Sequence, residues 1–193
     1  MLESNQFLIK ERVGFLKMRN VYDIFDLATG DQVGTAQEDT PSWVLALSFL
    51  INRRFLPATL VISKEKDGVP LVRLHRKMSL VGKVEIRDAK DRKIGLFKSK
   101  FLALKSKFRI FDVNEKQIGE VKGDWKGWNF SIVDHQDKEL GIITKKWAGL
   151  GKELFTTADN YVVSVNDQAS SDAQKLLLLS AGIAIDTVYK EGN

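Results

Sequence analysis

The C-terminal stretch KLLLLSAGIAIDTVYKE, Lys175 to Glu191, restricts the fold of this chain more than any other feature. Four consecutive leucines cover every face of a helix, so the helix has no polar side and must be buried all round or lie in lipid. The unbroken apolar run from Leu176 to Ile185 would form roughly 15 Å of helix, about half the hydrocarbon thickness of a bilayer. Placing Asp186 in lipid would cost a further ~2.5–3.5 kcal/mol. The stretch therefore predicts a buried core helix at about residues 172–190, preceded by a capping box at Ser171–Gln174, rather than a membrane span.

A helix buried on every side needs a wall around it, and a repeated hairpin unit predicts that wall. Each copy alternates apolar and polar residues, passes through a polar turn, and returns with an apolar residue directly before a glycine. The four copies are Tyr22–Ala36, Val84–Phe97, Phe108–Val121 and Phe130–Ile143, and a fifth hairpin is expected at Thr59–Lys77. In each repeat an Asp ends the first strand, where it can bond the turn backbone, and the glycine indicates close approach of two backbones. We predict a mainly β fold: a closed antiparallel β-barrel of about twelve strands that encloses the hydrophobic C-terminal α-helix.

One segment departs from the hairpin pattern. Thr40 and Pro41 precede the apolar run Trp43 to Ile51, and two arginines follow it. This arrangement predicts a short helix that Thr40 caps and whose C-terminal end the arginines favour. Two interpretations stay open for this helix, which either plugs or lies across the barrel, or inserts into the interface of a bilayer.

Composition limits the chemistry. The chain has no cysteine, which excludes disulfides and thiolate sites, and its formal net charge is +5. The N-terminus carries Glu3 and no apolar signal core, so we expect a cytoplasmic protein with, at most, peripheral attachment to a membrane. His75 and His135 have no evident catalytic partner, and Gly149–Lys152 lacks the earlier glycine of a phosphate-binding loop because Lys146 stands there. We therefore expect no enzyme activity and no catalytic residues.

The strongest local signal for a binding function is basic. Between Lys90 and Arg109 the sequence holds eight Lys or Arg residues and one acid. Alternation places Lys105, Lys107 and Arg109 on one outward strand face, with Lys98 and Lys100 on the preceding strand. Such a face attracts anionic lipid at about 1 kcal/mol per residue, although a merely solvated charged face is the alternative. Nucleic acid is a less suitable partner, since no aromatic residues interleave on that face.

Three stretches of the sequence carry a family resemblance. Gly141–Val165, the helix LLLLSAGIAIDTVYKE and Asn20–Thr40 resemble the phospholipid scramblases, which share a superfamily with the LURP-one-related proteins and the Tubby C-terminal domain. The resemblance covers nearly the whole chain and implies one domain, residues 1–193, with a twelve-stranded barrel around a hydrophobic helix. It also implies a partner such as an anionic phospholipid or a membrane surface, and we expect a monomer.

The chain departs from the scramblase pattern at the segment that resembles a calcium site. The segment reads TADNYVVSVND, with Thr157 where the family pattern has its first acid. Asp159, Asn160 and Asp167 could supply only part of the six to eight oxygens that calcium takes, so the Ca²⁺ site and a plain strand-entry turn both stay open. No other cofactor is expected.

Three functional hypotheses follow. The first is a membrane-surface module that binds anionic phospholipids, such as phosphoinositides, through Lys98, Lys100, Lys105, Lys107 and Arg109. The second is calcium-dependent phospholipid scrambling, which the family resemblance implies. The third is a regulatory or protein-interaction domain with no lipid role.

Overall fold

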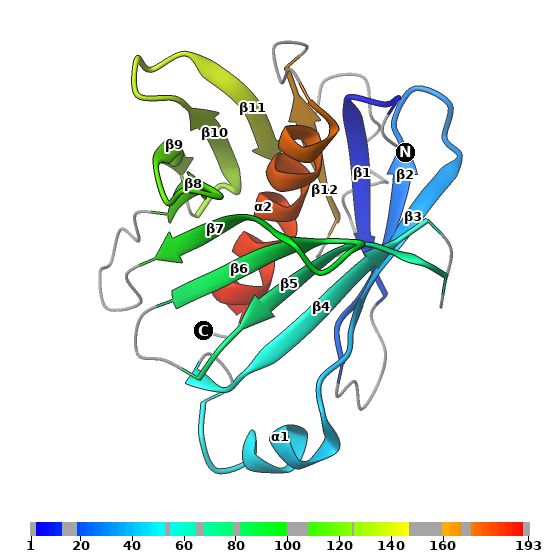
Figure 1. Ribbon diagram of the computed structural model, residues 1–193. Helices are drawn as coiled ribbons and strands as arrows, with labels where there is room; N and C mark the ends of the chain where they lie inside the picture. Colours follow the sequence, from blue (N-terminus) through cyan, green and yellow to red (C-terminus); the bar gives the residue numbers. More distant parts are fainter. Residues whose placement is uncertain are drawn as a thin grey trace.

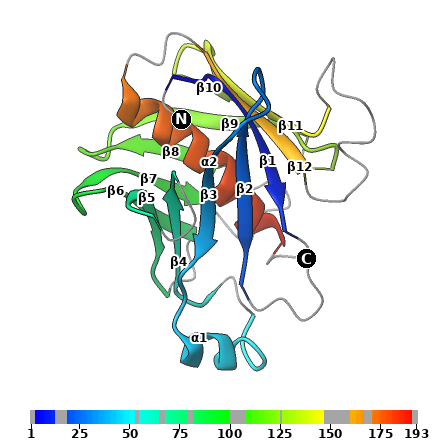
Figure 2. The same ribbon diagram turned by 90° about the vertical axis from the view of Figure 1, so that its right-hand side faces the viewer.

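The strands form one closed barrel around the C-terminal helix (Figures 1 and 2). The computed structural model describes residues 3–12, 19–52, 55–64, 68–78, 82–99, 108–124, 126–146, 160–166 and 171–190. The strands are β1 (Gln6–Glu11), β2 (Val21–Asp26), β3 (Gln32–Glu38), β4 (Ala58–Ser63), β5 (Pro70–Arg76), β6 (Gly82–Asp88), β7 (Lys93–Ser99), β8 (Phe108–Asp112), β9 (Gln117–Asp124), β10 (Asn129–Val133), β11 (Glu139–Thr144) and β12 (Asn160–Val165). The helices are α1 (Ser42–Leu47) and α2 (Asp172–Lys190). Each strand pairs antiparallel with its sequence neighbours, and β1 pairs with β12 to close the ring, which confirms the predicted twelve-stranded barrel.

The repeated hairpins have the predicted turn chemistry. In each one the carboxylate of the strand-end Asp accepts backbone N–H groups of its own turn. Asp112 Oδ1, for example, accepts from the amides of Asn114 and Lys116 at 2.9 Å each. Asp26, Asp88 and Asp134 do the same. These bonds satisfy turn amides that the strand ladder leaves unpaired, so the turn interpretation is confirmed.

The glycine of the returning strand lets two layers approach closely, as the sequence predicted. A Cβ on Gly95 would lie 2.7 Å from the Phe111 carbonyl oxygen and 2.9 Å from Leu177 Cδ1 of α2. A side chain here would therefore push β7 away from both its neighbouring strand and the central helix.

Helix α2 fills the barrel. Leu176 to Leu179 are all buried, and Ile183 and Ile185 have no exposed surface. Ser171 Oγ accepts the Gln174 amide at 3.2 Å, so the predicted cap forms. Burial of the four leucines contributes roughly 6–12 kcal/mol. The prediction of a core helix is confirmed, and neither helix of the described residues is long and apolar enough to cross a membrane.

A polar contact fixes the helix within this apolar interior. Asp186 of α2 is completely buried, and the hydroxyl of Tyr22 on β2 donates to its Oδ2 at 2.9 Å. Because a buried polar group is costly without a partner, this bond favours one rotation and one depth of α2 in the barrel.

Helix α1 differs from its prediction in length and in cap. It ends at Leu47 instead of Ile51, because the Phe49 and Leu50 amides donate to carbonyls three residues back, at 3.3 Å and 2.9 Å, so the backbone continues as a tighter turn. Pro41, not Thr40, is the N-cap, and no side chain caps the helix. The Thr40 hydroxyl donates to Glu38 Oε1 at 2.8 Å instead, since that buried carboxylate needs a donor. The arginines expected after the helix lie outside the described residues.

Candidate functional site

The two ends of the barrel differ in their connections. One end, called the turn end below, carries the short Asp turns and the N-terminus of α2. The other, called the loop end, carries α1 between β3 and β4 and the C-terminal half of α2 (Figure 1). Ser99 and Phe108, which flank undescribed residues 100–107, belong to the loop end as well. The segments that the sequence singled out for membrane contact therefore join the barrel at one end.

An exposed apolar cluster projects from the loop end. Phe49 is 80% and Leu50 85% exposed, and Trp43 and Ile51 are 58% and 42% exposed. These four residues are called the apolar tip below. Val44 and Leu45 are buried and attach the segment to the barrel. Most of the large apolar side chains that the described residues expose belong to this one segment, and such a concentration marks a surface that meets a partner or a membrane.

Cations lie beside the apolar tip. The guanidinium of Arg19, which is an exposed residue, donates to the Thr40 carbonyl at 3.2 Å, next to the start of α1. Exposed Lys77 directly follows Arg76, whose Nε donates to the Leu56 carbonyl at 3.1 Å where the α1 segment returns to β4. The tip is thus an apolar projection with two cations, Arg19 and Lys77, and one exposed acid, Asp39, at its base.

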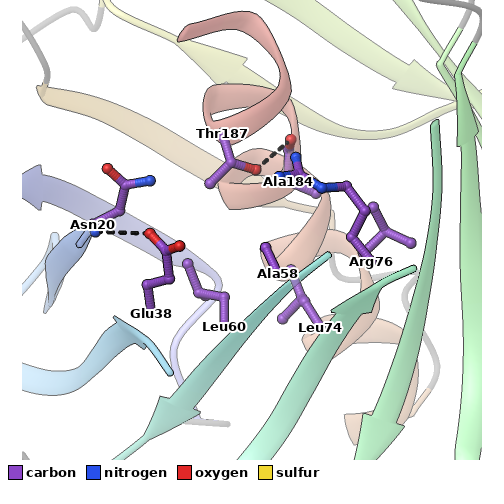
Figure 3. A pocket seen from close by; sticks show the side chains of 9 residues that line it. Asn20, Glu38, Ala58, Leu60, Leu74, Arg76, Ala184 and Thr187 are labelled. Carbon is purple, nitrogen blue, oxygen red and sulfur yellow. Dashed lines mark hydrogen bonds between the residues drawn. The ribbon is translucent and has the colours of Figure 1, made fainter. Parts of the chain in front are cut away.

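A small pocket opens at the loop end beside α2 (Figure 3). Its volume is about 30 Å³, and since a cavity needs roughly 10–15 Å³ to hold one water molecule, it is too small for a lipid. Figure 3 shows Glu38 and Arg76 at its edge and Leu60 and Leu74 on its wall. The Glu38 carboxylate accepts the Asn20 amide at 3.0 Å and thereby joins the entry of β2 to β3.

The predicted basic face is only partly described. Lys98 on β7 and Arg109 on β8 are cross-strand neighbours on the outer face, so the structure brings these two together. Lys100, Lys105 and Lys107 lie outside the described residues. Lys98 Nζ donates to Glu115 Oε2 at 3.2 Å and lies 4.5 Å from the centre of the Phe111 ring. Arg109 stands opposite Glu120 of β9. Glu115 and Glu120, which lie outside the basic stretch from Lys90 to Arg109, are thus next to the predicted cations.

The cations around Glu115 form a cluster that was not predicted from the sequence. Lys93 Nζ donates to Glu115 Oε1 at 2.9 Å, and Lys83 Nζ of β6 lies 3.7 Å from the same oxygen. Hydrogen bonds from Lys93 and Lys98, with the nearby charge of Lys83, lower the pKa of Glu115 to about 2. Lys83 is paired with Lys98 across the β6–β7 hairpin. Counting outward from that predicted turn would have placed the two lysines side by side.

The calcium residues do not form a described site. Asp159 and Asp167 lie outside the described residues, and Asn160 begins β12, where it is buried and stands opposite Lys10 of β1. Within the described ranges no group of three His, Cys, Asp or Glu residues is arranged to hold a metal ion. The calcium site remains a prediction.

Comparison with known proteins adds the family. The family model described as Scramblase matches residues 8–192. This chain belongs to the scramblase family. "Altered inheritance rate of mitochondria protein 25" of Saccharomyces cerevisiae is 26% identical over 88 residues, in a match that covers 38% of this chain and 27% of that protein. A phospholipid scramblase family protein of Schizosaccharomyces pombe is 27% identical over 95 residues, in a match that covers 47% of this chain and 23% of that protein.

The matches cover only part of each relative. The aligned segments span about a quarter of the length of each relative, at 27% and 23%. No solved structure matches the chain. Membership of the scramblase family confirms the resemblance to the phospholipid scramblases and points to a role connected with phospholipids.

Proposed function

We propose that this protein binds the surface of anionic phospholipid membranes through the loop end of its barrel. The observation that carries the proposal is the apolar tip, whose four large side chains are 42–85% exposed on one projecting segment. In this arrangement the tip enters the bilayer interface, and the cations around it contact lipid phosphates. Membership of the scramblase family supports a phospholipid as the partner.

The energies of the two contributions are comparable. Transfer of the exposed parts of the tip side chains from water would contribute about 4–8 kcal/mol before the cost of association is subtracted. Each cation near an anionic surface adds about 1 kcal/mol, which applies to Arg19 and Lys77 and, in our proposal, to Lys98, Lys100, Lys105, Lys107 and Arg109. We therefore expect binding that needs both the tip and the anionic lipid.

Vesicle co-sedimentation tests this function. The protein should sediment with vesicles that contain phosphatidylserine and stay in the supernatant with phosphatidylcholine alone. The double variant Phe49→Glu/Leu50→Glu should lose binding. Val69→Glu is the control for an added acid away from the loop end, because Val69 is 81% exposed in the β4–β5 connection at the turn end; Leu50→Glu alone adds the same charge and should also weaken binding. Equal sedimentation of the double variant and of Val69→Glu would contradict the assignment to the loop end.

Calcium-dependent scrambling is tested in the same vesicles. If Asp159, Asn160 and Asp167 hold calcium, millimolar calcium should raise the melting temperature, and Asp159→Asn should remove that rise. A dithionite assay with fluorescent lipid then measures whether lipid crosses the bilayer.

A further inference from the structure

Glu115 occupies an unusual place in the β8–β9 turn. Its backbone is left-handed, with φ 58°, and its side chain reaches the outer face of β6 and β7. There three ammonium groups meet one carboxylate, at 2.9 Å from Lys93, 3.2 Å from Lys98 and 3.7 Å from Lys83. Lys83, Lys93 and Lys98 are called the lysine trio below. The trio comes from two strands, so the barrel wall and not one flexible loop holds it.

The β6–β7 and β10–β11 hairpins also carry an acid at the left-handed turn position, but with fewer described cations around it. Asp91 and Asp137 occupy the equivalent left-handed positions, with φ 61° and 60°. Asp91 makes an ion pair with Arg87 at 3.2 Å, and Asp137 makes one with Lys122. Each of these acids therefore has one described cationic partner, whereas Glu115 has three.

The charges at the lysine trio do not balance. Among the described residues, three lysines surround the Glu115 carboxylate, and one further acid, Glu85, lies 3.9 Å from Lys83 and also accepts from Arg87 at 3.3 Å. The trio side chains are 25–40% exposed, so a ligand can reach them from solvent. Lys98 is further positioned by the Phe111 ring beneath its ammonium group. Three converging ammonium groups with excess positive charge suit a phosphate dianion better than a carboxylate, because a phosphate offers three acceptor oxygens and a second negative charge.

We propose that the lysine trio is a binding site for a phosphate monoester and that Glu115 is its internal competitor, which occupies the site when no ligand is bound. The ligand is either the headgroup of a phosphomonoester lipid or a soluble phosphate ester. In the first case the inference rests on the proposed membrane function and names its preferred lipid; in the second it stands apart from it.

Neutralising the competitor tests the site. Glu115→Asn suits the left-handed turn, since Asn tolerates that conformation, and it removes the carboxylate. Titration with glycerol phosphate, followed by amide chemical shifts of β6 and β7, should show binding tightened about three- to tenfold over the unsubstituted protein. Asp137→Asn is the matched control and should leave the affinity unchanged. Lys83→Gln/Lys98→Gln should abolish binding in the Glu115→Asn background.

Vesicles identify the source of the phosphate. If the ligand is a lipid, Glu115→Asn should strengthen sedimentation with phosphatidic acid, a monoester, and not with phosphatidylglycerol, a diester. If it is soluble, glycerol phosphate should bind while neither vesicle distinguishes the variant. Equal affinity of Glu115→Asn and the unsubstituted protein for both glycerol phosphate and phosphatidic acid, or an equal gain in Asp137→Asn, would overturn the site. The Phe49→Glu/Leu50→Glu variant separates the two proposals, because it should lose vesicles and keep glycerol phosphate.

Discussion

Removal of one buried hydroxyl should measurably loosen the central helix. Tyr22 lies inside the barrel with no exposed surface, and its hydroxyl donates to Asp186 of α2 at 2.9 Å. Tyr22→Phe keeps the ring and removes only this donor. A buried acceptor that loses a partner costs about 1–3 kcal/mol, so the free energy of unfolding should fall by that amount. For a chain of this size the melting temperature should then fall by roughly 2–12 °C.

A double-mutant cycle measures the coupling energy between Tyr22 and Asp186 directly. Urea unfolding followed by tryptophan fluorescence would be measured for Tyr22→Phe, Asp186→Asn and the double variant. If the two groups interact as the structure shows, the coupling energy should be about 0.5–3 kcal/mol. Ile24→Val, on the same strand and equally buried, is the control for a loss of volume without a loss of polarity and should cost about 0.5–1.5 kcal/mol. Additive effects, with Tyr22→Phe as stable as the unsubstituted protein, would refute this account of how α2 is fixed.

The same contact predicts a pH dependence. Burial, and then the nearby Asp186, raise the pKa of Tyr22 well above its ordinary value. The unfolded chain loses this proton at about pH 10 and the folded chain keeps it, so stability is full below pH 10 and falls above it. The contribution of one such group is at most about 1.4 kcal/mol per pH unit, and Tyr22→Phe should remove it.

Three shorter predictions concern the core and the charged wall. Leu178→Ala should cost about 2–5 kcal/mol of stability in urea unfolding, because Leu178 has no exposed surface among the barrel side chains. Gly95→Ala should cost about 1–3 kcal/mol in the same assay, since its Cβ would lie 2.7 Å from the Phe111 carbonyl oxygen; unchanged stability would contradict the close approach. The Glu115 carboxyl carbon, followed by NMR, should titrate near pH 2, and Lys93→Gln should move its pKa upward toward the ordinary value.

The fold could be predicted because its determinants are local. Hairpin turns and alternation fix which residues pair, and a helix with leucine on every face has no stable place except the inside of the barrel. The cap of α1 could not be predicted, because Thr40 had a stronger partner in the buried Glu38 carboxylate, which only the packed barrel supplies.

The surroundings of the predicted basic face could not be predicted, for a related reason. A count of charges along Lys90 to Arg109 finds one acid, yet Glu115 and Glu120 reach that face from the next turn and strand. Charge along a sequence window differs from charge on a sheet face, because each strand brings neighbours from outside the window. The apolar run from Trp43 to Ile51 was visible in the sequence, but whether it plugs the barrel or projects from it depends on which of its residues pack, here Val44 and Leu45.

Site-specific labelling of the loop end tests the central proposal most directly. Because the chain has no cysteine, Leu50→Cys and Val69→Cys each accept a single environment-sensitive fluorophore. Phosphatidylserine vesicles should shift the Leu50→Cys emission to the blue and expose the label to lipid-borne quenchers, while the label at Val69→Cys should stay in water. A label at position 50 that vesicles leave unchanged, or equal shifts at both positions, would contradict membrane binding by the loop end.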